Sequence, residues 1–453
     1  MPDDTMNGQE GPTPRDVIEW RQARLIRDAI PDAAFSPPDW DEQRHGADVI
    51  YRRSALLVRV WHEADVRAAL PRLVPGIEPF ERLPGGWDRP PLERDPANFD
   101  EVTGSLARIT WRGGDENGSV LEAVSRLEDR FGAGVARPEH LTYVCGHACA
   151  ADEPEVVPGT ATPEPPVQTG PAALDPTCGR GAGVRVLVMD NGLWPGAANE
   201  HPWLSGVTGD VDSGDSNDLG QDSGHGTFTA GCLRVTAPEA TVHVHNAAIA
   251  LPGPGSGPVG AQWETALANQ VRAGLAVQVP HVLVLNFAAA THGGRSMLAF
   301  DTLYDDVICH LKQLKIFCPA GNDGQALGLW PASYAWVVSV GALAANWLDR
   351  APWSNSGPTV DLYAPGDRLV NAYARGRYLT KWTDAPEERL FDGMARWGGT
   401  SFATPLVAGL VAARMSRTGQ SSSLAYADLL RLAQRQARAG VGPVLYPGQA
   451  CKA

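Results

Sequence analysis

The chain has 453 residues, more than one domain usually holds, and its apolar content of 43% is normal for a globular protein. A formal net charge of −14 without a strongly basic stretch argues against nucleic acid as a partner. No apolar run approaches the length of a membrane span, so a membrane partner is not expected either.

Residues 1–45 are predicted to form a polar N-terminal segment, rich in Pro, Asp and Arg, with one short helix over 15–30. The first ten residues hold three acids and neither a basic run nor an apolar core, so we expect no secretory signal there. Seven cysteines at irregular spacings indicate reduced thiols rather than a disulfide framework. Together these features favour a cytoplasmic location.

Residues 46–150 are predicted to form a small α+β domain. Its elements follow the order strand, helix, strand, strand, helix, strand, which is the ferredoxin-like (βαββαβ) pattern. The expected strands cover 54–61, 76–83, 106–111 and 141–145, and the expected helices cover 63–73 and 119–131. Residues 151–176 then contain seven prolines, several acids and no apolar period, so we predict an extended, exposed linker and a domain boundary.

Residues 177–453 have a different pattern, in which short apolar runs rich in β-branched residues alternate with helical segments. The runs cover 184–189, 242–244, 282–287, 316–319 and 336–340, with helices expected at 263–276 and 297–314. Buried strands that alternate with helices predict an α/β fold with a mostly parallel sheet, covered on both faces. In such sheets the functional crevice lies at the carboxyl ends of the strands.

Four polar residues stand at strand ends or helix starts of this region. Asp190 follows an apolar strand, His225 lies between glycines where a helix begins, Asn322 follows another strand, and Ser401 precedes an apolar helix. Each alone is compatible with an ordinary role, such as a turn or a helix cap. Together they supply the parts that acyl transfer requires: a nucleophile, a base, a group that orients the base, and an oxyanion donor.

With these residues the chain resembles the subtilisin-like serine peptidases (subtilases) over about 175–440. The similar blocks are Asp190-Asn191-Gly192, His225-Gly226-Thr227, Asn322, the stretch from Val340 to Gly366, and Gly399-Thr400-Ser401-Phe402-Ala403-Thr404-Pro405. The resemblance implies a three-layer subtilisin-like fold and a serine endopeptidase that acts on polypeptides. It assigns Asp190, His225 and Ser401 to the catalytic triad, and Asn322 to the oxyanion hole.

One block departs from the family pattern. Asn286 to Ala290 reads Asn-Phe-Ala-Ala-Ala, where the family typically has Asn-x-Ser-Leu-Gly in a strand that pairs with substrate backbone. Substrate preference therefore does not transfer, and an inactive, partner-binding subtilase scaffold stays open as an alternative. Small residues expected to border the pocket favour an apolar P1 side chain: Ala288, Ala289, Ala290, Ala320 and Gly321.

No metal or other cofactor is expected, although calcium stays open as an alternative because several subtilases bind it. The candidate oxygens belong to Asp210, Asp212, Asp215, Asp218 and Asp222. Their spacing matches no defined calcium loop, so we favour a solvated acidic loop. Two other groups lack ligands at suitable spacing: Cys145 and Cys149, expected in a surface turn, and His243 and His245, expected on one face of a strand.

The resemblance also gives the front domain a role. Subtilases are commonly made with a ferredoxin-like propeptide that assists folding and inhibits the site, which implies a zymogen cleaved in or near 151–176. A permanent regulatory or partner-binding domain in a cytoplasmic protease is the alternative, and the sequence leaves both open.

Overall fold

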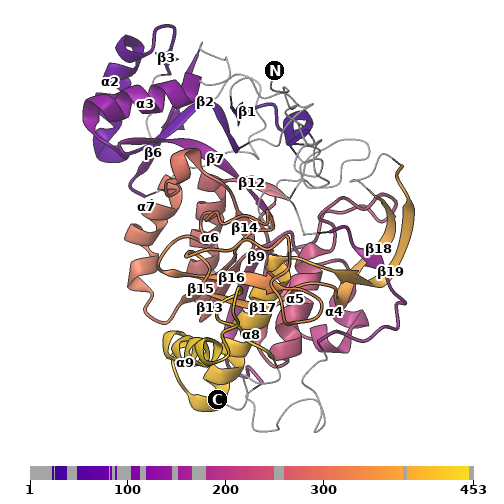
Figure 1. Cartoon of the computed structure of the whole chain (residues 1–453). Coiled ribbons are helices and arrows are strands. Elements are labelled where there is room, and N and C mark those ends of the chain that lie inside the picture. The colour runs from indigo at the N-terminus through magenta and orange to yellow at the C-terminus, as the bar shows by residue number, and fades with distance from the viewer. Residues whose placement is uncertain are drawn as a thin grey trace, which may run out of the picture.

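The computed structural model describes residues 23–24, 26–37, 48–80, 82–83, 87–88, 104–112, 119–144, 152–165, 180–248, 260–380 and 385–447 (Figure 1). The two predicted parts of the chain are visible as an N-terminal group of strands and helices and a larger α/β body. Among the described residues, no helix combines the length and apolarity that crossing a membrane requires. The turn expected at Cys145 and Cys149 lies outside the described residues.

A seven-stranded parallel sheet forms the centre of the larger body. Its strands, in spatial order, are β10 (Thr208–Gly209), β11 (Thr241–Asn246), β9 (Arg185–Asp190), β13 (Val282–Leu285), β15 (Lys315–Pro319), β16 (Val337–Leu343) and β17 (Leu362–Pro365). Along β9, Val186 and Val188 pack into one hydrophobic core, whereas Leu187 and Met189 pack into another. The alternation follows from the two-residue period of a strand and buries both faces of the sheet.

Helices cover both faces, which confirms the expected α/β fold with a mostly parallel sheet. Side chains of α5 (His225–Thr236), α8 (Thr400–Thr418) and α9 (Ser422–Arg435) belong to the first core, and those of α6 (Glu264–Gln278) and α7 (Leu298–Asp306) belong to the second. The helix expected over 297–314 ends at Asp306 because Val307 leaves the helical conformation. Single-turn helices lie at Val60–His62, Ala197–Glu200, Pro202–Leu204, His292–Gly294 and Ile308–His310.

Helix α8 crosses the core close to α5. It is buried on all sides from Thr400 to Ala413, carries polar residues in its last turn, and ends at Gly419 in the left-handed conformation. A Cβ atom on Gly409 would lie 2.0 Å from the hydroxyl oxygen of Thr236 and 2.7 Å from the carbonyl oxygen of Leu233. The two helices can approach this closely because Gly409 has no side chain.

The N-terminal part has the expected βαββαβ order and a hydrophobic core of its own. Its elements are β2 (Val49–Arg59), α2 (Glu63–Leu73), β3 (Glu78–Pro79), β6 (Leu106–Arg112), α3 (Ser119–Phe131) and β7 (Ala136–Val144), with a short pair formed by β4 (Arg82–Leu83) and β5 (Trp87–Asp88). The strands lie in the order β7-β2-β6-β3, with antiparallel neighbours. The polar character expected for 1–45 does not hold at β1 (Ala33–Ser36), whose buried apolar residues pair with β2.

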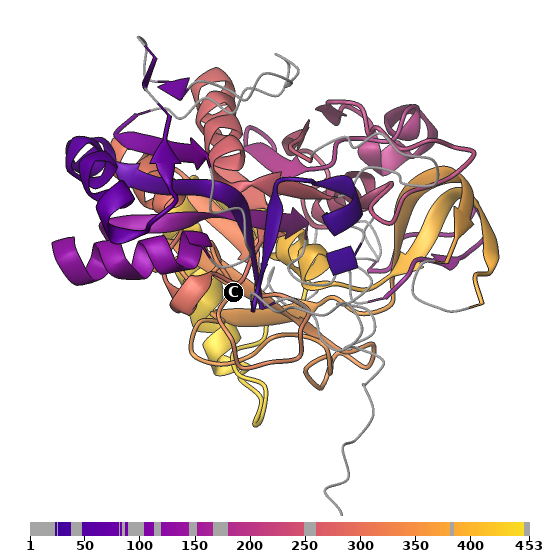
Figure 2. The ribbon, with the colours of Figure 1, turned by 90° about the horizontal axis from the view of Figure 1, so that it is seen from above.

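The N-terminal sheet continues into the larger body. Strand β7 pairs antiparallel with β12 (Ala261–Trp263) and with β14 (Phe287–Ala288). Figure 2 shows the N-terminal strands on one side of the molecule and the hairpin of β18 (Leu369–Leu379) and β19 (Glu388–Trp397) on the other. Two strands of the larger body, β12 and β14, thus extend the N-terminal sheet, which is separate from the parallel central sheet.

The linker expected over 151–176 is described only for 152–165, where it is extended as predicted but docks on the larger body and is exposed only in part. Strand β8 (Glu155–Val156) pairs with β19, and the side chain of Val157 is buried. The indole nitrogen of Trp397 donates to the carbonyl oxygen of Asp152 at 2.6 Å. An extended segment docks in this way because its backbone groups complete the open edge of the hairpin.

Candidate active site

Asp190 is the last residue of β9, at the carboxyl end of the central sheet. Its side chain is fully buried, and its two carboxylate oxygens have different partners. The backbone N–H of Asn191 donates to Oδ1 at 2.8 Å, and the side-chain amide of Asn286 donates to Oδ2 at 2.8 Å. A buried carboxylate needs such donors to hold its charge and its orientation.

His225 begins α5 directly after Gly224, which has a φ of +76°. That left-handed conformation favours glycine and turns the chain so that the imidazole faces β9. Nδ1 of His225 lies 2.7 Å from Oδ1 of Asp190, and Nε2 lies 3.0 Å from Oγ of Ser401. The carboxylate favours the tautomer with the proton on Nδ1, so Nε2 can accept the proton of the serine hydroxyl.

Ser401 is the second residue of α8, where backbone N–H groups of the first turn have no partner within the helix. The positive end of the helix dipole lies at the same place and favours negative charge. Ser401 and His225 are both fully buried in the intact chain.

Asn322 lies beside the start of α8, three residues after the last strand residue of β15. Its Oδ1 atom accepts hydrogen bonds from the backbone N–H and the hydroxyl of Thr400, both at 2.9 Å. With the amide oxygen held in this way, the NH₂ group is the end of the amide that can donate to an oxyanion at Ser401. Thr400 is a positioning residue that the sequence analysis did not identify.

Aromatic rings enclose the imidazole of His225. Its ring centroid lies 4.9 Å from that of Phe402 and 5.6 Å from that of Trp397. These contacts keep water away from the histidine and strengthen its interaction with Asp190. Trp397, which reaches the site from the end of β19, belongs to none of the sequence motifs described above.

Two asparagines join the parts of the site. Asn191 accepts from the backbone N–H of Gly226 at 2.7 Å and donates to the carbonyl oxygen of Asp222, which ties the turn after β9 to the start of α5. Asn286 was considered only as part of a family block, although it comes directly after β13, beside the end of β9 where Asp190 lies. That strand-end position is the signal that would have identified it.

The acidic stretch before His225 is not simply solvated, which corrects the sequence prediction for two of its five acids. Asp212 and Asp222 are buried and accept backbone N–H bonds from Gly224 and Gly260, respectively, at 2.7 and 2.6 Å. Burial raises the pKa of Asp212 to about 7, against the effect of its backbone donors. The carboxylate of Asp212 thus ties the stretch to the start of α5, and that of Asp222 ties it to Gly260, whereas Asp215 is exposed.

The expected substrate-binding residues lie at the same edge of the sheet. Ala288 belongs to β14, Ala289 bridges Trp330, and Ala320 and Gly321 follow β15. The remaining member of the set is the half-buried Ala290. In the intact chain, the strand position beside Ala288 is occupied by Tyr143 of β7.

Comparison with known proteins places this geometry in context. Residues 181–441, more than half of the chain, match the model of the subtilase family. Thermitase of Thermoactinomyces vulgaris is 28% identical over 255 residues, which cover 54% of this chain and 78% of that protein. An intracellular serine protease of Paenibacillus polymyxa is 29% identical over 256 residues, covering 51% and 67%.

Other similarities are more limited. An alkaline proteinase of Hapsidospora chrysogena is 36% identical over 115 residues, which cover 25% of each protein. The chain thus spans less than two thirds of some of the relatives that it matches. The crystal structure of a cold adapted subtilisin-like serine proteinase aligns with a TM-score of 0.43 and 21% identity, covering 59% of this chain and 90% of that one.

Proposed function

Because this chain belongs to the subtilase family, we propose that it is a serine endopeptidase that hydrolyses peptide bonds through an acyl-enzyme on Ser401. The observation that carries the proposal is the hydrogen-bonded series Asp190, His225, Ser401, with distances of 2.7 and 3.0 Å. A nucleophile, a base and a group that orients the base in this order suit acyl transfer.

In the proposed mechanism, Ser401 attacks the scissile carbonyl while Nε2 of His225 takes its proton. Asp190 holds the imidazole and stabilises its cation, and His225 then gives the proton to the leaving amine. The NH₂ group of Asn322 and the backbone N–H of Ser401 bind the oxyanion of the tetrahedral intermediate. Loss of one such donor in a subtilisin costs on the order of 10²–10³-fold in turnover.

We further propose that Ala288, Ala289, Ala290, Ala320 and Gly321 border the substrate-binding pocket. Small side chains leave room without placing charge there, so an apolar P1 residue is expected. A peptide library that varies only P1 tests this preference, and a requirement for a charged P1 residue would contradict it.

A second proposal concerns the N-terminal part, which we infer to be an inhibitor of the same site. Strand β7 lies antiparallel to β14, where the backbone of a substrate is expected, and Val144 pairs with Phe287. The chain re-enters the described structure at Asp152, against Trp397, whose ring packs on His225. The chain before and after 145–151 therefore flanks the catalytic residues.

We place the protein in the cytoplasm as a further part of this proposal. The described cysteines, Cys232, Cys309 and Cys318, are all free, which is typical of a reducing compartment. Fractionation of the producing cells tests the location, and recovery from the medium would contradict it.

A fluorophosphonate probe tests both the enzyme and its inhibition. We expect the intact chain to react slowly and the chain cleaved in 145–176 to react quickly, with Ser401→Ala inert in both forms. If neither form reacts at Ser401, the alternative of an inactive subtilase scaffold is correct. If the intact chain reacts as fast as the cleaved chain, the peptidase proposal stands and the inhibitor proposal fails.

A further inference from the structure

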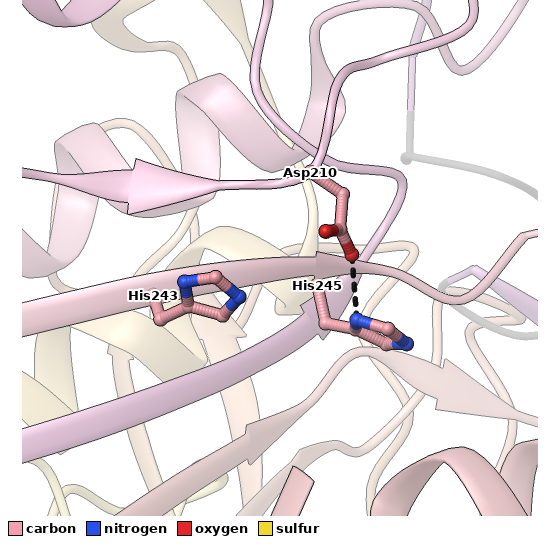
Figure 3. Close-up of side chains that lie close together, drawn as sticks. All are labelled: Asp210, His243 and His245. Atoms are coloured by element: carbon pink, nitrogen blue, oxygen red, sulfur yellow. Dashed lines mark ion pairs between the residues drawn. The ribbon is translucent and has the colours of Figure 1, made fainter. Parts of the chain in front are cut away.

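A group of side chains of the types that bind metal ions lies at the edge of the central sheet, apart from the proposed catalytic residues (Figure 3). His243 and His245 are two residues apart on β11 and therefore share one face of the strand. Asp210 directly follows β10, which pairs in parallel with β11. One ligand atom from each of the three side chains lies within 4.8 Å of the other two. The structure thus supplies the third ligand that the two histidines lack in the sequence.

The carboxylate of Asp210 is fixed in front of β11. Its Oδ2 atom lies 2.6 Å from Nδ1 of His245 and accepts the backbone N–H of Asn246 at 2.9 Å. The backbone N–H of Asp210 donates to the carbonyl oxygen of Val244 at 2.9 Å. Both the backbone and the carboxylate of Asp210 are therefore hydrogen-bonded to the strand that carries the histidines.

The ring of His243 is oriented by Thr208. The hydroxyl oxygen of Thr208 lies 3.1 Å from Nδ1 of His243 and donates to the carbonyl oxygen of Val242 at 3.4 Å. In the tautomer with the ring proton on Nδ1, the imidazole donates to this hydroxyl while the hydroxyl donates to the carbonyl. The lone pair of His243 then lies on Nε2, and a hydrogen bond to the other ring nitrogen is the usual support of a metal-binding histidine.

We propose that Asp210, His243 and His245 form a binding site for a divalent transition metal ion, with Zn²⁺ as the expected occupant. Two imidazoles and one carboxylate suit Zn²⁺, whereas Ca²⁺ and Mg²⁺ prefer oxygen ligands. Three protein ligands leave a fourth position for water. The side chains of His245 and Asp210 are 33% and 45% exposed, so an ion can enter from solvent.

Binding needs only small movements of these side chains. An ion about 2.1 Å from each ligand atom in tetrahedral geometry holds those atoms about 3.4 Å apart. The ligand atoms lie within 4.8 Å of one another, so their separations shorten by up to about 1.4 Å. Exposed side chains on a strand make such shifts through small rotations of their χ angles.

The site lies one strand away from the catalytic aspartate. Asn246, next to His245, pairs with Asp190 across β11 and β9, and the backbone N–H of Ala247 donates to the carbonyl oxygen of Asp190 at 2.8 Å. An ion at Asp210 joins the segment after β10 to this strand end. Its expected effect is to stabilise the native sheet edge, because it binds groups that only the folded chain brings together.

The test uses the full-length chain with Ser401→Ala, which prevents self-cleavage, in titration calorimetry and thermal unfolding with zinc chloride. We expect one Zn²⁺ per chain and a rise in Tm of about 5 °C at a zinc concentration roughly 100-fold above the dissociation constant. Calcium chloride at the same concentration is expected to give no rise in Tm that depends on Asp210, His243 or His245.

Variants separate this site from adventitious zinc binding. His243→Ala and His245→Ala are each expected to weaken binding more than tenfold, and Thr208→Val about tenfold through loss of ring orientation. Asp210→Asn, which keeps a carbonyl acceptor for Asn246, is expected to weaken binding through loss of charge. His310→Ala removes an exposed histidine elsewhere and serves as the matched control. Zinc binding and Tm shifts that survive His243→Ala/His245→Ala unchanged, or no zinc binding by the parent, would overturn the proposal.

Discussion

The side-chain amide of Asn286 donates to Oδ2 of Asp190 at 2.8 Å. The other carboxylate oxygen of Asp190 lies 2.7 Å from His225, so the asparagine holds the carboxylate from the side opposite the imidazole. The same amide nitrogen lies 3.0 Å from the hydroxyl of Thr229 and 3.4 Å from the carbonyl oxygen of Ser401. One residue at the end of β13 thus contacts both helices that carry the proposed base and nucleophile.

Asn286→Ala is therefore expected to lower kcat about ten- to hundredfold with little change in KM. A hydrogen bond to a charged group contributes about 1.5–3 kcal/mol, and about 1.4 kcal/mol corresponds to a tenfold change in rate. Steady-state kinetics on the cleaved enzyme measures the effect. Thr229→Val, which leaves the donor to Asp190 in place, is the control. A variant that folds with the parent's Tm and keeps the parent's kcat would show that Asn286 does not position Asp190.

The contact between β7 and the peptidase body gives a second prediction. The backbone N–H of Val144 donates to the carbonyl oxygen of Gly260 at 2.5 Å, and proline at this position removes the donor and disturbs the strand. Val144→Pro is expected to raise the peptidase activity of the intact chain at least about tenfold, since it removes the bond to Gly260 and its ring disturbs the pairing of β7 with β12 and β14.

The matched control is Val144→Ala, which keeps the N–H group and is expected to behave like the parent. Initial rates are measured with a chromogenic peptide, and mass spectrometry establishes that each chain is uncleaved. Equal rates for the proline and alanine variants would mean that this strand does not restrain the site. If the intact parent never self-cleaves but Val144→Pro is active, the N-terminal part is a permanent regulator rather than a propeptide.

Features governed by local patterns were predictable from the sequence. Short apolar runs rich in β-branched residues indicated β9, β13 and β15, and the rule that functional groups lie at the carboxyl ends of parallel strands indicated Asp190 and Asn322. The βαββαβ order was predictable for the same reason, although β3 has only two residues. Strand β10 was missed because it has only two residues, and β17 was missed because Leu362–Pro365 contains no β-branched residue.

Long-range relationships were not predictable in this way. Nothing within 136–144 indicates that β7 pairs with β12 and β14, whose sequence positions lie more than 100 residues away. Docking of the linker was not predicted, because proline and acid content indicates only the local conformation of a segment. Whether β8 pairs depends on the open edge of β19, which lies far away in the sequence. The third ligand-type side chain near His243 and His245 was missed for the same reason, since Asp210 meets them only across a strand pair.

The close approach of α5 and α8 gives a stability prediction. Gly409→Ala places a Cβ atom 2.0 Å from the hydroxyl of Thr236 and 2.7 Å from a backbone carbonyl oxygen, which cannot move alone. We expect a loss of roughly 1–3 kcal/mol in unfolding free energy, the usual cost of overpacking. At Gly274 in α6, the corresponding atom is the end of the flexible Leu187 side chain, at 2.8 Å. Gly274→Ala is the matched control, and equal Tm values for the two variants would contradict the prediction.

The raised pKa of Asp212, about 7, predicts a specific pH dependence of stability. The native state keeps this proton up to about pH 7, whereas an unfolded aspartate releases it near pH 3.9. Between these values the native state binds more protons than the unfolded state, so this group's contribution to the unfolding free energy falls as pH rises. The contribution is fully present below about pH 4 and is lost above about pH 7.

Asp212→Asn removes this titration, so the Tm of the parent is expected to fall relative to that of the variant between pH 5 and pH 8. One pH unit in pKa corresponds to about 1.4 kcal/mol, and 1 kcal/mol corresponds to about 2–4 °C for a domain of this size, so the relative change is about 5–10 °C. Asp215→Asn alters an exposed acid of the same stretch and is expected to follow the parent at every pH. A constant difference in Tm between the parent and Asp212→Asn would mean that Asp212 is ionised throughout this range. Its two backbone donors, Gly214 and Gly224, would then outweigh the effect of burial.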